Sequence, residues 1–439
     1  MSMLQYLDRY AEPEARGLPA LTTRYRHVVC IPAFAEAADF LVPLSSRLDT
    51  AETLFIIVLN AHAGAGGEAI MQTRAGAAWL KSQYPHRQPL GPHCWLLSGQ
   101  RSEQIAAQRH DILLVERCHR DAYLGPKEGV GKARKIAADI ACRLIQLGRV
   151  SSPWIHCTDA DATLPPDYFA ATGMLDARRD SAGLYPFRHL PHADPAANTA
   201  QALYDLTLDY YVAGLAWAGS PWAFHTIGST LVINAQHYAR VRGFPVRRAG
   251  EDFYLLGKLA KTGAIVTLDS TAIMLETRVS DRVPFGTGPA LGKLLGMLDP
   301  AAEYPCYNPL AFSYLQCWLG LSATLWQERV QELDEAVIRA FCAANADYDT
   351  LDADVLLACV TALGIDKALN HALDNSRSEK VFQRHLTNWF DAFQTLKFIH
   401  WLRDNHLPSV PVRLIQDGTC LPFGAVPGRN GPVRPASNQ

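Results

Sequence analysis

The first half of the chain alternates short β-branched runs with alanine-rich segments of helix length, and this alternation constrains the fold more than any other feature. Strands are predicted at 27–32, 53–60, 111–117 and 154–159, and helical periodicity covers 36–48, 70–83 and 131–147. Neighbouring parallel strands need crossover connections of this length. The pattern therefore predicts an α/β fold with a mostly parallel, Rossmann-like sheet that is flanked by helices.

The pattern changes after residue 161, where prolines divide the chain into loops. Further strands are predicted at 230–234 and 264–268, and further helices at 198–217 and 251–262. Beyond about residue 300 no strand is predicted, and helical periodicity continues from 310 to 403. We therefore expect four segments: a helical extension (1–26), an α/β domain (27–300), an all-α domain (301–408) and a Pro/Gly-rich tail (409–439).

Composition excludes several classes of protein. The 439 residues include 41 Lys and Arg against 43 Asp and Glu, and 49% are hydrophobic, so neither a disordered chain nor a nucleic-acid-binding protein is expected. Ten scattered cysteines without a Cys-x-x-Cys pair are typical of reduced thiols in a cytoplasmic protein. The N-terminus lacks the apolar core of a signal peptide. The apolar stretch 309–326 contains polar residues, so we expect a buried or interfacial helix and no transmembrane segment; peripheral membrane contact is compatible with this.

The sharpest chemical feature is an Asp-x-Asp pair directly after a predicted strand. Asp159 and Asp161 can both reach one hard cation if the strand ends there and the chain bends. Carboxylate ligands suit Mg²⁺ or Mn²⁺, which in turn can hold a nucleoside diphosphate. The carboxyl edge of a parallel sheet is also where such folds bind ligands. Taken alone, the pair is more typical of a solvated loop with two surface acids.

Three other motifs give this pair a context. They are IPAFAE (31–36) at the end of the first strand, GVGKAR (129–134) at the start of the third helix, and GFP (243–245) followed by AGEDFY (249–254). In this order, over residues 27–281, the chain resembles the inverting family 2 glycosyltransferases. The resemblance implies a GT-A-like catalytic domain and a metal-dependent, hexosyltransferase-type enzyme that uses a nucleoside-diphosphate sugar and Mg²⁺ or Mn²⁺.

The resemblance also implies roles for individual residues. The donor would be bound by Pro32, Ala33, Glu36, Asn60, Gly131, Lys132, Arg134, Asp159, Arg278 and Arg282, and the metal by Asp159 and Asp161. Asn60 stands where many relatives have an aspartate that contacts the uracil edge, so the base stays open. The GVGKAR segment matches neither a P-loop nor a dinucleotide fingerprint, and its glycines are also compatible with a simple turn.

Inverting transfer requires a carboxylate that deprotonates the acceptor hydroxyl. Asp252 matches the family's general base, with Glu251 beside it as a positioning or acceptor-binding group; both acids would also suit a helix N-terminus without any catalytic role. The loop before the strand at 230 would bind the acceptor through Gly228, Ser229, His225 and Trp222. For Trp222 a structural role in the core is an equal alternative, and for His225 a hydrogen-bonded structural role is the more common one.

Two rival activities use similar parts. A retaining glycosyltransferase of the same fold would need no general base, and a nucleotidyltransferase would release pyrophosphate; the latter predicts a Gly- and Arg-rich loop after the first strand, which 33–39 is not. A nucleotide-sugar-binding regulator is a third, non-enzymatic alternative. The sequence leaves open the sugar, the hydroxyl acceptor, the role of the C-terminal helices and the oligomeric state.

Overall fold

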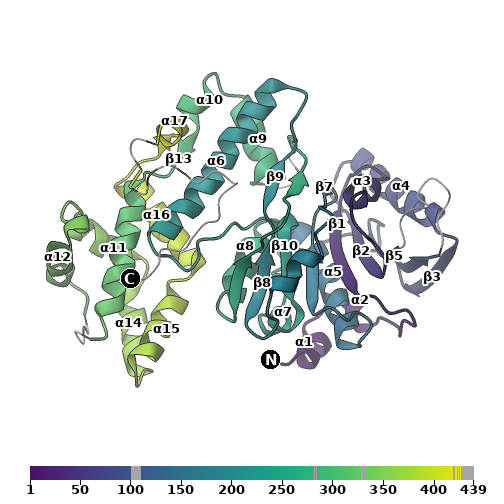
Figure 1. Ribbon diagram of the computed structural model, residues 1–439, viewed down its shortest axis with the longest axis horizontal. Coiled ribbons are helices and arrows are strands. Elements are labelled where there is room, and N and C mark those ends of the chain that lie inside the picture. Colours follow the sequence, from purple (N-terminus) through teal and green to yellow (C-terminus); the bar gives the residue numbers. More distant parts are fainter. Residues whose placement is uncertain are drawn as a thin grey trace. The chain divides into compact units, whose positions relative to one another are not determined.

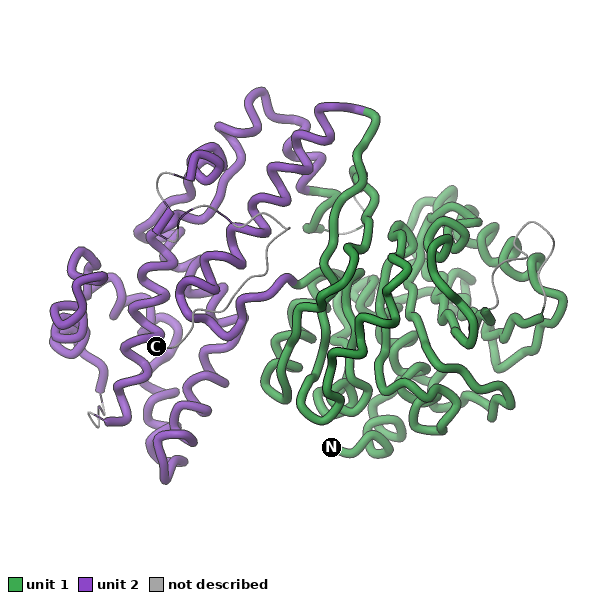
Figure 2. Tube along the Cα trace, viewed as in Figure 1, with its two compact units in different colours: residues 1–193, 226–289 green, residues 194–225, 290–439 purple. Residues whose placement is uncertain are grey.

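The computed structural model describes residues 1–99, 110–280, 282, 284–327, 330, 332–418, 421, 422, 424 and 426. Cys420 and residues 427–439 of the expected tail lie outside these ranges. The chain divides into two compact units, shown in Figure 2: unit 1 contains 1–193 and 226–289, and unit 2 contains 194–225 and 290–439. The sequence-based boundaries place 194–225 in the α/β domain, whereas in the structure this segment packs with the C-terminal helices.

A large mixed sheet forms the centre of unit 1. Among the described residues it has nine strands, in the order β11-β8-β10-β6-β1-β2-β5-β4-β3. Seven run in one direction, because only β10 and β4 pair antiparallel with both of their neighbours. The strands are β1 (His27–Ala33), β2 (Thr53–Asn60), β3 (His86–Gly91), β4 (Cys94–Ser98), β5 (His110–Arg117), β6 (Trp154–Cys157), β8 (Asp180–Leu184), β10 (Leu231–Asn234) and β11 (Ala264–Thr267). The expected mostly parallel sheet is confirmed.

Helices flank this sheet and cover its central strands (Figure 1). Helix α5 packs on β1, β2 and β6, and α4 packs on β2. The central strands are almost continuously apolar because they are covered in this way; Val28 to Ile31 and Leu54 to Val58 are at most 1% exposed. The helices of unit 1 are α1 (Met3–Arg9), α2 (Pro13–Arg16), α3 (Leu41–Ser45), α4 (Gly67–Gln83), α5 (Gly129–Gln146), α7 (Ala235–Arg240) and α8 (Glu251–Leu259).

A small second sheet lies beyond the ends of the large one. It has the order β7-β12-β9, with β7 (Ala162–Thr163) antiparallel and β9 (Phe187–His189) parallel to β12 (Ile273–Leu275). Leu275 pairs with Ala162, and the amide of Glu276 donates to the carbonyl of Asp161 at 3.2 Å. This pairing brings the segment after β12 beside the Asp-x-Asp pair.

The N-terminal segment is attached to unit 1 by a buried polar cluster around Asp139 of α5. Its carboxylate accepts hydrogen bonds from the hydroxyls of Tyr6 and Tyr238, from the Glu12 amide at 2.8 Å and from Lys135 Nζ at 2.8 Å. Asp139 is fully buried. The expected extension 1–26 is therefore tied to the core of unit 1 through α1 and α2.

Unit 2 is built from helices around its own apolar core. Tyr210 and Phe312 pack edge to face at 5.4 Å, and the Tyr210 hydroxyl donates to the carbonyl of Tyr307 at 2.8 Å. The helices are α6 (Pro195–Trp217), α10 (Pro300–Glu303), α11 (Leu310–Thr324), α12 (Glu335–Ala343), α13 (Ala353–Ala362), α14 (Ile365–Asp374), α15 (Glu379–Trp389), α16 (Ala392–Asn405) and α17 (Val412–Gln416); α9 (Thr287–Leu295) spans the division between the units.

Several elements differ from the sequence-based expectation. The helix expected at 36–48 is reduced to α3, because Ala35 adopts a positive φ of 52° and Glu36 is engaged in ion pairs. No strand was expected after residue 300, yet β13 (Pro305–Cys306) and β14 (Val410–Pro411) form a short antiparallel pair. In the described part of the chain no single helix has the length and apolarity to cross a membrane, although α13 and α14, bent by 73°, satisfy both criteria as a pair.

Candidate active site

Several of the predicted site residues of unit 1 gather at the carboxyl edge of the large sheet. Glu36 follows β1, Asp159 and Asp161 follow β6, and Gly228 precedes β10, which enters the sheet from this edge. Arg278 follows β12 and is brought in by the small sheet. Residues that are far apart in the chain therefore form one polar cluster.

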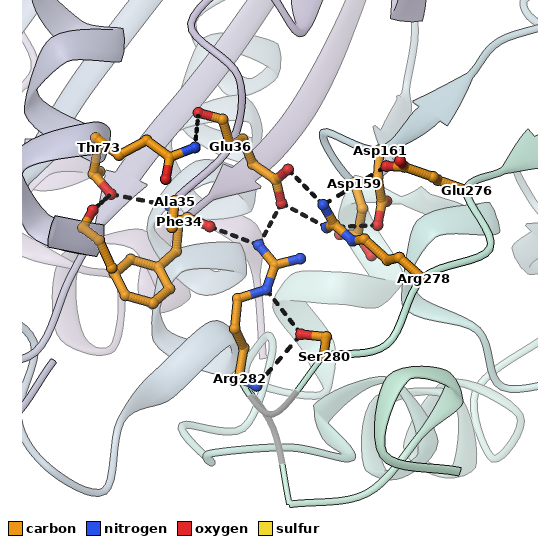
Figure 3. Close-up of polar contacts among 12 residues, drawn as sticks. Phe34, Ala35, Glu36, Thr73, Asp159, Asp161, Glu276, Arg278, Ser280 and Arg282 are labelled. Carbon is orange, nitrogen blue, oxygen red and sulfur yellow. Dashed lines mark hydrogen bonds and ion pairs between the residues drawn. The ribbon is translucent and has the colours of Figure 1, made fainter. Parts of the chain in front are cut away.

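Glu36 binds two arginines from the segment after β12 (Figure 3). Arg278 donates from Nη1 and Nη2 to the two carboxylate oxygens of Glu36, at 2.8 and 2.7 Å. Arg282 donates from Nη1 to the same carboxylate and to the carbonyl of Phe34 at 2.6 Å. Burial by itself would raise the pKa of Glu36, but the hydrogen bond from Arg278 and the charge of Arg282 outweigh it and lower the pKa. Glu36 is therefore a carboxylate at neutral pH.

The turn that presents Glu36 is held by two residues of α4 that sequence reasoning missed. The hydroxyl of Thr73 accepts a hydrogen bond from the Ala35 amide at 3.0 Å, and Gln72 Nε2 donates to the carbonyl of Glu36 at 3.2 Å. These bonds stabilise the positive φ of Ala35, a backbone conformation that non-glycine residues rarely adopt. The only signal in the sequence is a polar threonine on a predicted helix, which is too common to single out.

The two aspartates of the Asp-x-Asp pair face different arginines. Asp161 Oδ2 lies 2.8 Å from Arg278 Nη2, whereas Asp159 Oδ1 accepts from Arg134 Nη2 at 2.7 Å. Burial and the neighbouring charge of Asp159 raise the pKa of Asp161 to about 6, against the opposing effect of Arg278. Glu36, Asp159 and Asp161 do not bring three oxygens within 4.8 Å of one another, because the Arg278 guanidinium lies between Glu36 and Asp161.

Arg134 of α5 connects the Asp-x-Asp pair to the start of α8. Besides Asp159 it donates from Nε to Glu251 Oε1 at 2.8 Å and from Nη1 to the carbonyl of Gly228 at 3.0 Å. The side chain is 5% exposed, so its position is set by these three acceptors. A Cβ atom at residue 228 would lie 2.6 Å from Arg134 Nη2, which explains the requirement for glycine there.

Glu251 and Asp252 form the first turn of α8, after Gly250 with a positive φ of 74°. Glu251 is 3% exposed and bound to Arg134, and Asp252 Oδ1 accepts from the Phe253 amide at 2.7 Å. Burial and the charge of Glu251 raise the pKa of Asp252 to about 7, although Arg134 opposes this effect. A carboxyl group with this pKa can accept a proton near neutral pH.

The other predicted donor residues have different surroundings. Pro32 and Ala33 end β1 beyond its last pairing with β6 at Cys30, and Asn60 ends β2. The Gly131 amide donates to the carbonyl of Arg247, and a Cβ there would lie 2.7 Å from that oxygen. Lys132 pairs with Glu12 at 2.7 Å and with Glu128 at 3.3 Å. The contacts of residues 131 and 132 are thus internal to the fold.

The four predicted acceptor residues fall in both units. Gly228 and Ser229 belong to unit 1 and are buried. Trp222 and His225 belong to unit 2, where the Trp222 indole donates to the carbonyl of Phe390 at 3.1 Å and His225 Nε2 lies 3.4 Å from Asp209 Oδ1. These partners are compatible with structural roles for Trp222 and His225.

A second group of residues of metal-binding types lies at the end of β5. Donor atoms of Glu116, Cys118 and His119 lie within 4.8 Å of one another. Lys81 forms an ion pair with Glu116, and the buried Cys118 thiol has a pKa raised to about 11 by burial. Lys81 already supplies the positive charge, so we assign no metal to this group.

The main cluster carries surplus negative charge. Counting only described residues, six carboxyl groups (Glu36, Asp159, Asp161, Glu251, Asp252 and Glu276) surround three guanidinium groups (Arg134, Arg278 and Arg282). Oxygen donors with excess negative charge fit a hard divalent cation. The residues that would contact it first are Asp159 and Asp161, which are only partly covered, with side chains 34% and 23% exposed.

No protein-family model matches the chain, and no curated protein matches its sequence. Among solved structures, the chain is similar to the mannosyltransferase PcManGT from Pyrobaculum calidifontis, in complex with GDP-Man and Mn²⁺. The identity is 15%, the match covers 88% of this chain and 94% of that one, and the TM-score is 0.33. A likeness at this level carries no argument about function.

Proposed function

We propose that this protein is a metal-dependent glycosyltransferase that moves a sugar from a nucleoside-diphosphate sugar to an acceptor hydroxyl with inversion. One observation carries the proposal: Arg134 bonds both to Asp159 of the Asp-x-Asp pair and to Glu251 at the start of α8, directly beside Asp252, whose pKa burial raises to about 7. A donor site and a candidate base are thereby combined in one network. We also propose that the fold is of the GT-A type and that the enzyme is a relative of the family 2 glycosyltransferases.

Asp159 and Asp161 would hold Mg²⁺ or Mn²⁺, which would supply charge neutralisation for the diphosphate when bound. Arg278 and Arg282 add positive charge beside Asp161 and suit phosphate oxygens, because guanidinium groups bind them with two parallel hydrogen bonds. Pro32, Ala33 and Asn60, at the ends of β1 and β2, would face the nucleoside.

Asp252 would accept the proton of the acceptor hydroxyl as it attacks the anomeric carbon from the face opposite the diphosphate. Glu251 is already bound by Arg134, so its role would be to position the start of α8. This leaves Asp252 as the base. A retaining enzyme would not require a carboxylate with this raised pKa, which is why inversion is the first choice.

Two measurements test the proposal. Thermal unfolding with UDP, GDP and nucleotide sugars, each with and without Mn²⁺, should show a rise in Tm for one donor only when metal is present. NMR of the product then gives the anomeric configuration. An axial product from an axial donor would exclude inversion, and the absence of any nucleotide effect would exclude the donor site.

A further inference from the structure

The guanidinium of Arg278 lies between two carboxylates and supplies the positive charge that a bound metal cation would supply there. Its Nη2 nitrogen lies 2.7 Å from Glu36 Oε1 and 2.8 Å from Asp161 Oδ2, so one nitrogen links the end of β1 to the end of β6. Figure 3 shows the Arg278 guanidinium between Glu36 and Asp161, and Arg282 bonded to Glu36 as well. Without Arg278, Asp161 would lose the counter-charge bonded to its carboxylate, while Arg282 would still neutralise Glu36 beside it.

Arg278 differs from Arg134 in its freedom to move. The Arg134 side chain is 5% exposed and has three acceptors from three separate segments. Arg278 also pairs with three carboxylates, those of Glu36, Asp161 and Glu276. Its side chain, however, is 27% exposed and follows the end of β12, so it can turn away without unpacking the core. Arg282 can continue to neutralise Glu36 after such a turn, because it bonds to that carboxylate independently.

We propose that Arg278 is a placeholder for the divalent cation: its guanidinium neutralises Asp161 and Glu36 until a metal ion binds, and it then turns to the diphosphate. The exchange replaces one positive group on Asp161 with another and delivers the released arginine to the anion that accompanies the metal. Metal and nucleotide would therefore each favour binding of the other, and linkage requires the two effects to be equal. This inference rests on the proposed donor site.

The test compares Arg278→Gln with Arg282→Gln by measuring binding directly. Free Mn²⁺ is titrated by electron paramagnetic resonance with the protein alone, and UDP and GDP are titrated by calorimetry at saturating Mn²⁺. The two variants lose the same charge beside Glu36, but in the structure only Arg278 is bonded to Asp161. The Arg282 variant is therefore a control for the general effect of removing a positive charge.

For Arg278→Gln we expect effects of opposite sign. Mn²⁺ alone should bind about fivefold more tightly than to the wild type, because the competing Arg278 guanidinium is gone. The affinity for the nucleotide should fall by about fivefold or more. Arg282→Gln should change Mn²⁺ affinity much less. Thermal unfolding of both variants checks that they are folded.

Equal gains in Mn²⁺ affinity for both variants would overturn the placeholder role, because the loss of any positive charge near the site would then explain the result. Unchanged or weaker Mn²⁺ binding by a folded Arg278→Gln protein would also overturn it. If the wild type binds neither Mn²⁺ nor nucleotide, the proposed function fails and this inference fails with it. If the wild type binds both ligands and Arg278→Gln shows no opposite effects on them, the placeholder inference fails while the proposed function stands.

Discussion

Unit 1 contains two polar clusters built around buried or half-buried carboxyl groups, and they differ in how their charges are balanced. Around Asp139, one lysine, two tyrosine hydroxyls and one amide satisfy a single buried carboxylate. At the sheet edge, carboxyl groups outnumber guanidinium groups by six to three among the described residues. The first cluster is balanced by groups of the chain itself, whereas the second has carboxyl groups in excess, which a divalent cation would balance under the proposed function. Under that proposal, charge balance separates a structural network from a functional one.

The largest effect on turnover is expected from a substitution of Asp252. Asp252→Asn should lower kcat/KM by about 10²- to 10⁴-fold, because the amide cannot accept the proton of the acceptor hydroxyl. The melting temperature and the affinity for Mn²⁺ should stay close to those of the wild type. Asp269→Asn, which changes an exposed residue of the same unit, is the matched control. Unchanged turnover in Asp252→Asn would end the assignment of Asp252 as the base.

Asp139→Asn should act on stability instead. The new amide nitrogen would face the donors of Lys135 or Glu12, and Lys135 would lose its counter-charge, so we expect a loss of about 3 kcal/mol. Urea unfolding followed by circular dichroism measures this, with the exposed Asp8→Asn on α1 as the control. The rate per folded molecule should not change; if it falls with little loss of stability, the division between the two clusters does not hold.

The pH dependence of turnover should follow Asp252. Its pKa is raised to about 7, mainly by burial, so kcat/KM should fall about tenfold per pH unit below 7 as the base becomes protonated. Asp161, with a pKa raised to about 6, titrates on the same side, so the profile is measured at saturating Mn²⁺. An acidic limb near pH 4 would show that the active site does not raise the pKa of its base.

The smallest effect is expected for Lys132, which the sequence pattern assigns to the donor. Because its partners are Glu12 and Glu128, Lys132→Gln should leave the Kd of the nucleotide unchanged. It should lower stability by about 1–3 kcal/mol, because the mostly buried Glu12 loses its counter-charge. Calorimetric titration with UDP or GDP and Mn²⁺ measures this Kd. If the Kd of the nucleotide rose tenfold in Lys132→Gln, Lys132 would have to be counted as part of the donor site.

The central strands could be predicted because they are buried on both faces and therefore apolar throughout. The hairpin of β3 and β4 could not, since His86 to Pro89 are exposed and β3 contains both a proline and a glycine. The three strands of the small sheet have only two or three residues each, which is too short for any periodicity. Their pairing depends on contacts between distant segments.

The same limit applies to the site. The sequence predicts that Glu36, Asp159 and Asp161 end strands, and hence that they share one edge of the sheet. It does not show that Arg278 joins Glu36 to Asp161, because 242 residues separate Glu36 from Arg278. Nor does it show that the Gly131 and Lys132 positions face Arg247 and Glu12. Motifs located the cluster, and tertiary pairing decided which residues meet within it.

The division into units has a consequence for anyone who shortens this chain. Unit 2 contains 194–225, which lies between the two stretches of unit 1, so deleting residues after 289 does not remove unit 2 cleanly. The truncated protein would keep α6 but lose Phe312 and the other core partners of Tyr210, and the apolar side of α6, with Leu203 and Leu215, would become exposed. An isolated α/β unit therefore needs a new connection from 193 to 226, and a simple C-terminal truncation is expected to aggregate.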